Sequence, residues 1–137
     1  MTTLNEKAVN MGVTLEFIQA EIEGCEASIS SWSEAFLKNP AYELSAAQRI
    51  YARAAQLKVL QEVQRDFVQY LASLKSKGRD NDNAIADFQT LKSEWTDRVL
   101  RAASYPVIST ISSEVIMARH ELQALARALE KYFGVNP

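Results

Sequence analysis

The chain has 137 residues, of which 47% are hydrophobic and 23% are charged, with a net charge of −2. This length fits one domain, and this composition is typical of a globular protein rather than a disordered one. Four glycines and three prolines argue against a turn-rich β-sandwich. No apolar run approaches the ~20 residues that cross a bilayer, and the nearly balanced charge argues against nucleic acid and anionic membranes as primary partners.

The cysteine content and the first residues of the chain indicate the cellular compartment that we expect for this protein. A single cysteine, Cys25, cannot form an internal disulfide and suits a reducing environment. Residues 1–6 have neither the basic nor the apolar segment of a secretory signal. We therefore expect a cytoplasmic protein.

The first predicted helix covers residues 4–37. Its apolar series consists of Leu4, Ala8, Met11, Leu15, Ile18, Ile22, Cys25, Ile29, Trp32 and Phe36. The gaps alternate between four and three residues, which is the spacing of a coiled-coil seam. Thr3 and Glu6 offer a capping box at the start, and Asn39-Pro40 ends the helix because proline moves the preceding residue out of the α region.

The second predicted helix covers residues 46–77. Ser45 and Gln48 offer a capping box, and Gly78 is suited to a left-handed C-cap. Its apolar series consists of Ile50, Leu57, Leu60, Phe67, Leu71 and Leu74, interrupted by Arg53 and Gln64. Val63, Val68 and Tyr70 widen the face that we expect to be buried.

The third predicted helix covers residues 84–103 and follows a short polar connection. Its inward residues are Ile85, Phe88, Leu91, Trp95, Val99 and Ala102. A connection this short favours an antiparallel neighbour.

The fourth predicted helix covers residues 105–133. Ser104 and Pro106 read as an N-cap and a first-turn proline, although Ser112 or Ser113 offers an alternative start. The apolar series consists of Ile108, Ile111, Val115, Ala118, Leu122, Leu125, Leu129 and Tyr132. Gly134 is expected to end this helix.

These elements predict an all-α fold, an antiparallel up-down bundle of four helices with coiled-coil-like seams in one domain of residues 1–137. The first two helices are the longest, at roughly 45–50 Å each, so part of the first hairpin lacks a cover within the chain. Residues 1–38 carry six acidic and two basic side chains, whereas residues 45–79 carry seven basic and two acidic ones. We expect this contrast to help pair the first two helices, whether the seams close within one chain or between chains.

The chain offers few groups for catalysis. The single histidine, His120, lies opposite the fourth apolar series and is expected to be solvated, and Cys25 lies on a seam, where a buried thiol is a poor nucleophile. The acidic cluster Glu21, Glu23 and Glu26 is expected on the exposed side of the first helix. Glycine-rich phosphate-binding motifs are absent from the sequence. We therefore expect no enzyme activity, no cofactor and no metal.

Three apolar residues of the first helix form a second stripe away from its seam. Val9, Val13 and Phe17 follow one another at intervals of four, and Glu16 and Glu21 give the stripe a polar edge. A contiguous exposed apolar stripe with a polar border is typical of a protein contact. The other apolar residues off the seams are Tyr51, Val59, Leu100, Ile116 and Met117, which scattered surface positions explain.

Three functional hypotheses follow. The first is a non-enzymatic interaction or assembly protein that binds a partner protein, a second copy of itself, or both. The second is a small regulator or inhibitor that covers a nucleic-acid- or peptide-binding surface of an enzyme through the acidic face of Glu16, Glu21, Glu23 and Glu26. The third is a nucleic-acid-binding module that uses a basic face of Arg49, Arg53, Lys58 and Arg65, against which the net charge argues.

Overall fold

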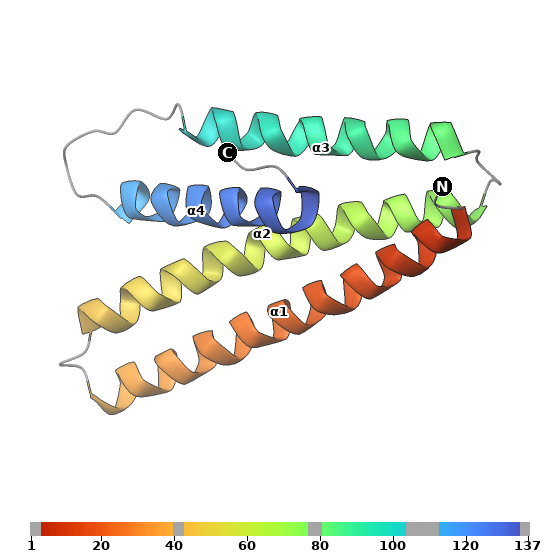
Figure 1. Ribbon diagram of the computed structural model, residues 1–137. Helices are drawn as coiled ribbons and strands as arrows, with labels where there is room; N and C mark the ends of the chain where they lie inside the picture. Colours follow the sequence, from red (N-terminus) through yellow and green to blue (C-terminus); the bar gives the residue numbers. More distant parts are fainter. Residues whose placement is uncertain (1–3, 40–42, 77–80, 104–112, 135–137) are drawn as a thin grey trace.

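The computed structural model contains the helices α1 (Leu4–Lys38), α2 (Glu43–Ser76), α3 (Asn81–Ala103) and α4 (Ser113–Phe133) (Figure 1). The structure describes residues 4–39, 43–76, 81–103 and 113–134, and all of these except Asn39 and Gly134 are helical. The predicted all-α fold of four antiparallel helices is confirmed. None of the described helices has an apolar stretch long enough to cross a membrane.

The second helix starts earlier than its predicted cap. α2 begins at Glu43, so Ser45 lies within the first helical turn and the predicted capping box of Ser45 and Gln48 is wrong. The helix resumes soon after Pro40 because proline disfavours the α conformation only at the residue before it. α3 likewise begins at Asn81, three residues before the predicted start.

The fourth helix is described from Ser113, which was the alternative start, and not from residue 105. The predicted cap at Ser104 and Pro106, like those at Thr3 and Gly78, lies outside the described residues. At the other end, Gly134 has a φ of 69°, a conformation that glycine adopts without a Cβ clash, and it ends α4 as predicted.

The helices do not form a square bundle. α1 and α2 make a long hairpin with the most extensive contacts, and the shorter hairpin of α3 and α4 packs on α2 mainly through α4 (Figure 1). α2 and α3 touch little, so α1 and α3 lie on opposite outer sides of the central pair. As a result, α1 has α2 as its main neighbour, and the face of α1 turned away from α2 is left uncovered.

Small residues of α4 pack against α2. Ala124 and Ala128, one turn apart, are both buried, and they line a narrow space together with Val59 of α2. The distance between packed helices depends on the side chains at their contact, so an alanine pair permits a close approach. This approach explains why Val59, which was predicted to lie off the seam, is only 1% exposed.

Aromatic rings from three helices meet at the centre of the core. Phe67 of α2 is 0% exposed, and its ring centroid lies 5.2 Å from that of Phe133 and 6.3 Å from that of Phe88. Trp95 of α3 stacks on Phe133 at 5.7 Å. The buried hydrophobic residues described are Met11, Ile18, Ile22, Cys25, Val59, Leu60, Val63, Phe67, Leu74, Trp95, Val99, Ala124, Leu125, Ala128, Leu129 and Phe133. Most of them belong to the predicted seams.

Val68 and Phe133 also depart from the predicted burial. Val68 was expected to widen the buried face of α2, but half of it is exposed, because α4 packs on the Val59 and Val63 side of the helix instead. Phe133 was absent from the predicted series of α4 and is buried in the aromatic cluster.

Polar side chains fix α3 against α2. The Trp95 indole Nε1 donates a hydrogen bond of 2.9 Å to Asp66 Oδ2, and Arg98 Nη2 lies 2.5 Å from Glu62 Oε2. The Arg98 guanidinium also covers the Trp95 ring at 4.4 Å. Glu62 and Asp66 are the two acidic residues of the otherwise basic segment 45–79, and both are used to bind α3.

The predicted attraction between an acidic α1 and a basic α2 takes another form. Gln64 of α2 donates a hydrogen bond to Gln19 of α1, and the Arg49 guanidinium lies 4.5 Å from the centre of the Trp32 ring. The described ion pairs between helices join α1 to α4, α2 to α4 and α2 to α3. Charge therefore positions the second hairpin on the first.

The α1–α2 hairpin extends beyond α4 at the end where α1 finishes and α2 begins (Figure 1). Within this hairpin Ile29, Trp32 and Ile50 are only half-buried, and Leu37, next to the last residue of α1, is 78% exposed. The expected excess of the first hairpin over the second is therefore present.

We expect Phe67→Ala to lower the free energy of unfolding by about 3–5 kcal/mol, because it removes the ring at the centre of the core. Val68→Ala is the matched control. Val68 follows Phe67 in the chain but is half exposed, so we expect the free energy of unfolding to change by no more than about 0.5 kcal/mol. Urea unfolding followed by circular dichroism measures both. Equal losses in the two variants would contradict the described core.

Candidate functional site

The apolar stripe of α1 consists of Val9, Val13 and Phe17, which are 61%, 46% and 63% exposed. Met11, which lies between Val9 and Val13, and Ile18, which follows Phe17, are buried against the other helices, so the stripe lies on the opposite side of α1. The predicted exposure of these three large side chains is confirmed. They give the first half of α1 a contiguous apolar outer surface.

This outer surface continues further along α1 than the sequence reasoning proposed. Ala20, Gly24 and Ala27 are exposed and follow Phe17 at intervals of three, four and three residues. Nothing lies within 4 Å of the position that a Cβ of Gly24 would occupy. The spacing of four, four, three, four and three from Val9 to Ala27 could have revealed this second series, but its small residues were not considered.

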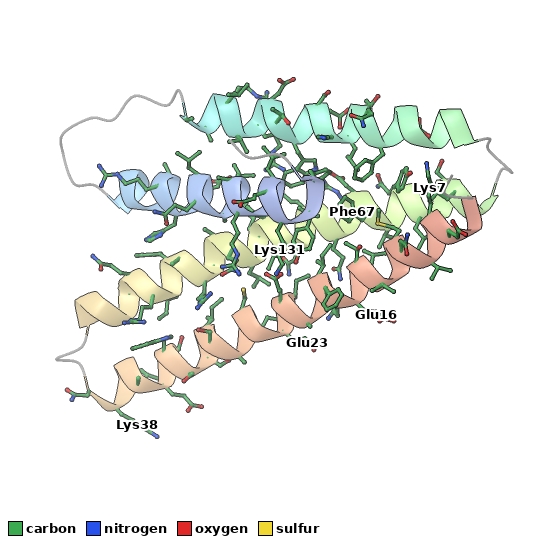
Figure 2. All side chains as sticks on the ribbon, viewed as in Figure 1. Lys7, Glu16, Glu23, Lys38, Phe67 and Lys131 are labelled. Atoms are coloured by element: carbon green, nitrogen blue, oxygen red, sulfur yellow. The ribbon has the colours of Figure 1, made fainter. Side chains whose placement is uncertain are left out.

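Acidic residues border the stripe on one edge. Glu16 and Glu23 are exposed and point away from the other helices (Figure 2), and Glu26 is also exposed. Of the two residues predicted to border the stripe, Glu16 is exposed and adjoins Phe17 in the chain, whereas Glu21 is not exposed; Glu23 and Glu26 lie on the same edge as Glu16.

Glu21 does not belong to that exposed face. It is half-buried, and its Oε1 atom pairs with the Lys131 ammonium and accepts a hydrogen bond from the Tyr132 hydroxyl. The expectation that Glu21 lies on the solvated side of α1 is therefore wrong. The reason is that α4 ends beside the middle of α1, where its last turn supplies both partners.

These contacts change the acidity of the groups involved. Burial by itself raises the pKa of the Glu21 carboxyl, but the hydrogen bonds from Lys131 and Tyr132 outweigh burial and place the pKa below the ordinary value of 4.5. Burial and the bond to Glu21 raise the pKa of the Tyr132 hydroxyl. Glu21 is thus held as a carboxylate that joins α1 to α4.

The four residues of the predicted basic face do not gather on one surface. Arg49 lies over Trp32 of α1, whereas Lys58 pairs with Glu121 of α4 at 3.4 Å. Arg53 donates a hydrogen bond of 2.8 Å to Gln56, and Arg65 lies 3.4 Å from Asp66. These cations are directed to different neighbours within the fold.

The two candidate reactive side chains differ in their surroundings. Cys25 is buried as expected, and burial raises the pKa of its thiol, which disfavours the nucleophilic thiolate. His120 was expected to be solvated but is half-buried, beside Gln56 and Arg127 in a shallow hollow of about 140 Å³. Within residues 4–39, 43–76, 81–103 and 113–134, no three His, Cys, Asp or Glu side chains are grouped as metal ligands.

A cleft of about 300 Å³ was missed by the sequence reasoning. Residues of all four helices line it, including Met11, Tyr70, Phe88 and Tyr132. The periodicity of each helix indicates that these residues face inward, but it does not reveal a space that remains between four helix ends.

Comparisons with protein-family models, curated proteins and solved structures gave no match.

We expect Glu21→Gln to lower the free energy of unfolding at neutral pH by about 1–2 kcal/mol, because it removes a carboxylate that accepts charged hydrogen bonds. The folded-state pKa of Glu21 lies below the unfolded one, so this stabilisation is present above the ordinary value of 4.5 and is lost as the pH falls through the folded value. The difference in the free energy of unfolding between the unchanged chain and Glu21→Gln should therefore become smaller as the pH falls. Urea unfolding at a series of decreasing pH values measures it.

Glu16→Gln serves as the control for Glu21→Gln, because Glu16 lies exposed on the same helix. It should leave stability nearly unchanged at every pH. A loss in Glu21→Gln that is the same at neutral and acidic pH would contradict the described role of the Glu21 carboxylate.

Proposed function

We propose that this chain is a non-enzymatic interaction protein of the cytoplasm, which binds a partner protein or a second copy of itself through the apolar stripe of α1. The observation that carries the proposal is the exposure of Val9, Val13 and Phe17 on the side of α1 opposite its buried residues. Burying apolar area contributes roughly 25 cal/mol per Å², so covering three such side chains favours association. Monomeric proteins seldom leave a contiguous stripe of this kind without a use.

The border of the stripe supports a protein contact in particular. Protein interfaces combine an apolar centre with a polar rim, and Glu16 and Glu23 lie beside the apolar residues of α1. Both elements of such an interface are held by one helix that Ile18 and Ile22 anchor to the core. A surface on a rigid helix needs little ordering when a partner binds.

The acidic border also favours a narrower version of this function, in which the chain regulates an enzyme by covering a basic surface. Glu16, Glu23 and Glu26 remain exposed for such a contact, whereas Glu21 is used within the fold. Electrostatic complementarity of this kind acts mainly on the rate of association and makes it sensitive to salt. Binding that does not change with salt concentration would argue against this version.

We expect Val13→Glu with Phe17→Glu to abolish association, because charges would replace the apolar centre of the stripe. Both positions are exposed, so helicity by circular dichroism should stay within error of the unchanged chain. Light scattering coupled to size-exclusion chromatography tests self-association against the monomer mass of 15.3 kDa. Affinity purification from the source cells, with quantitative mass spectrometry, tests association with other proteins.

Leu100→Glu is the matched control, because Leu100 is 62% exposed on α3, outside the stripe. It should retain the mass and the co-purifying proteins of the unchanged chain. If the double variant also retains both, the stripe is not the interaction surface.

A further inference from the structure

The cleft between the four helices lies beside the N-terminal half of α1, where the first turns of α1 and α3 approach the last turns of α2 and α4 (Figure 1). Its volume is about 300 Å³. That volume is at the lower end of the range of small-molecule sites in proteins. The cleft therefore has room for a ligand of one or two fused rings.

The floor of the cleft is aromatic. Phe67, Tyr70 and Phe88 line it together with Met11, and the Tyr70 and Phe88 ring centroids are 5.7 Å apart. Faces and edges of such rings pack favourably against a flat aromatic ligand, and the Met11 thioether adapts to the shape of its neighbours. This floor selects for a planar apolar body.

The rim of the cleft provides a cation and two amide side chains. Lys7 is half-buried on the side of α1 that is turned towards the other helices (Figure 2), and the exposed residues Asn10 of α1 and Gln89 of α3 also line the cleft. Among the described residues, no carboxylate or other hydrogen-bond partner engages the Lys7 ammonium. Lys7 therefore places a positive charge beside an apolar space, with no counter-ion among the residues that the structure describes.

Lys7 differs in this respect from the cations of the groove between α2 and α3. In that groove Arg65 lies beside Asp66, and Arg98 pairs with Glu62. Those guanidiniums already have carboxylate partners, so the groove offers little to an added anion. At the cleft, by contrast, the Lys7 ammonium has no carboxylate partner among the described residues and lies beside aromatic side chains.

We infer that this cleft binds a small aromatic carboxylate. The ring system lies on Phe88, Tyr70 and Met11, and the carboxylate accepts hydrogen bonds from the Lys7 ammonium and from the side-chain amides of Asn10 or Gln89. The cleft residues of α1 are different from those of the apolar stripe, so the binding site does not depend on the proposed interaction surface.

The test uses the full ¹⁵N-labelled chain titrated with 2-naphthoate and, separately, with its neutral analogue 2-naphthamide, followed by amide chemical shifts. We expect saturable shifts for 2-naphthoate centred on residues 7–14 and on Phe88 and Gln89. We expect 2-naphthamide to bind about tenfold more weakly, because a hydrogen bond to a charged partner is stronger than a neutral one.

Three variants separate the contributions. Lys7→Gln should weaken 2-naphthoate about tenfold and leave 2-naphthamide unchanged, whereas Lys38→Gln, which alters an exposed cation at the far end of α1, should change neither. Thr14→Phe should block both probes, because Thr14 lines the cleft from α1.

Three results would overturn the inference. These are shifts from 2-naphthoate that do not saturate or that lie away from the cleft, equal binding of the acid and the amide to the unchanged chain, and equal affinity of 2-naphthoate for Lys7→Gln and the unchanged chain. Circular dichroism of each variant establishes that a loss of binding is not a loss of fold.

Discussion

The arrangement of the helices depends on α2, which contacts all three other helices. Gln64 and Arg49 face α1, Val59 packs with the alanines of α4, and Asp66 accepts a hydrogen bond from α3. α3 packs mainly on α4, and α1 packs mainly on α2, so the four helices do not close into a square. The two outer helices therefore have little contact with each other, and each keeps one side without a cover.

Periodicity alone predicted the four helices and the exposure of the apolar stripe, because both depend on the spacing of residues along one helix. It did not predict the burial of Val59 or the exposure of Val68. Spacing gives the angular position of each side chain around its helix, but not the angle at which the next helix lies. That angle follows from tertiary packing, here from the close approach that Ala124 and Ala128 permit.

The polar residues of the candidate site were harder to predict than the apolar ones. Glu21 and Glu23 are neighbours in an acidic cluster, yet one is joined to α4 and the other is exposed. A carboxylate on the border of a helix face is placed by whichever cation reaches it, and Lys131 is far away in the sequence. The cleft was beyond sequence reasoning for a similar reason, because it is a space between four elements and not a property of one.

The end of the first hairpin that lies beyond α4 has a consequence for the dynamics of the protein. Ile29, Trp32 and Ile50 are only half-buried and Leu37 is exposed, so few apolar contacts among the described side chains must break for the segment to open. Backbone amides in this part of α1 can therefore exchange their hydrogen with solvent through local fraying, without global unfolding. Amides near Ile18 and Phe67 are protected by the whole fold, so the chain should show a gradient of exchange rates along a single continuous helix.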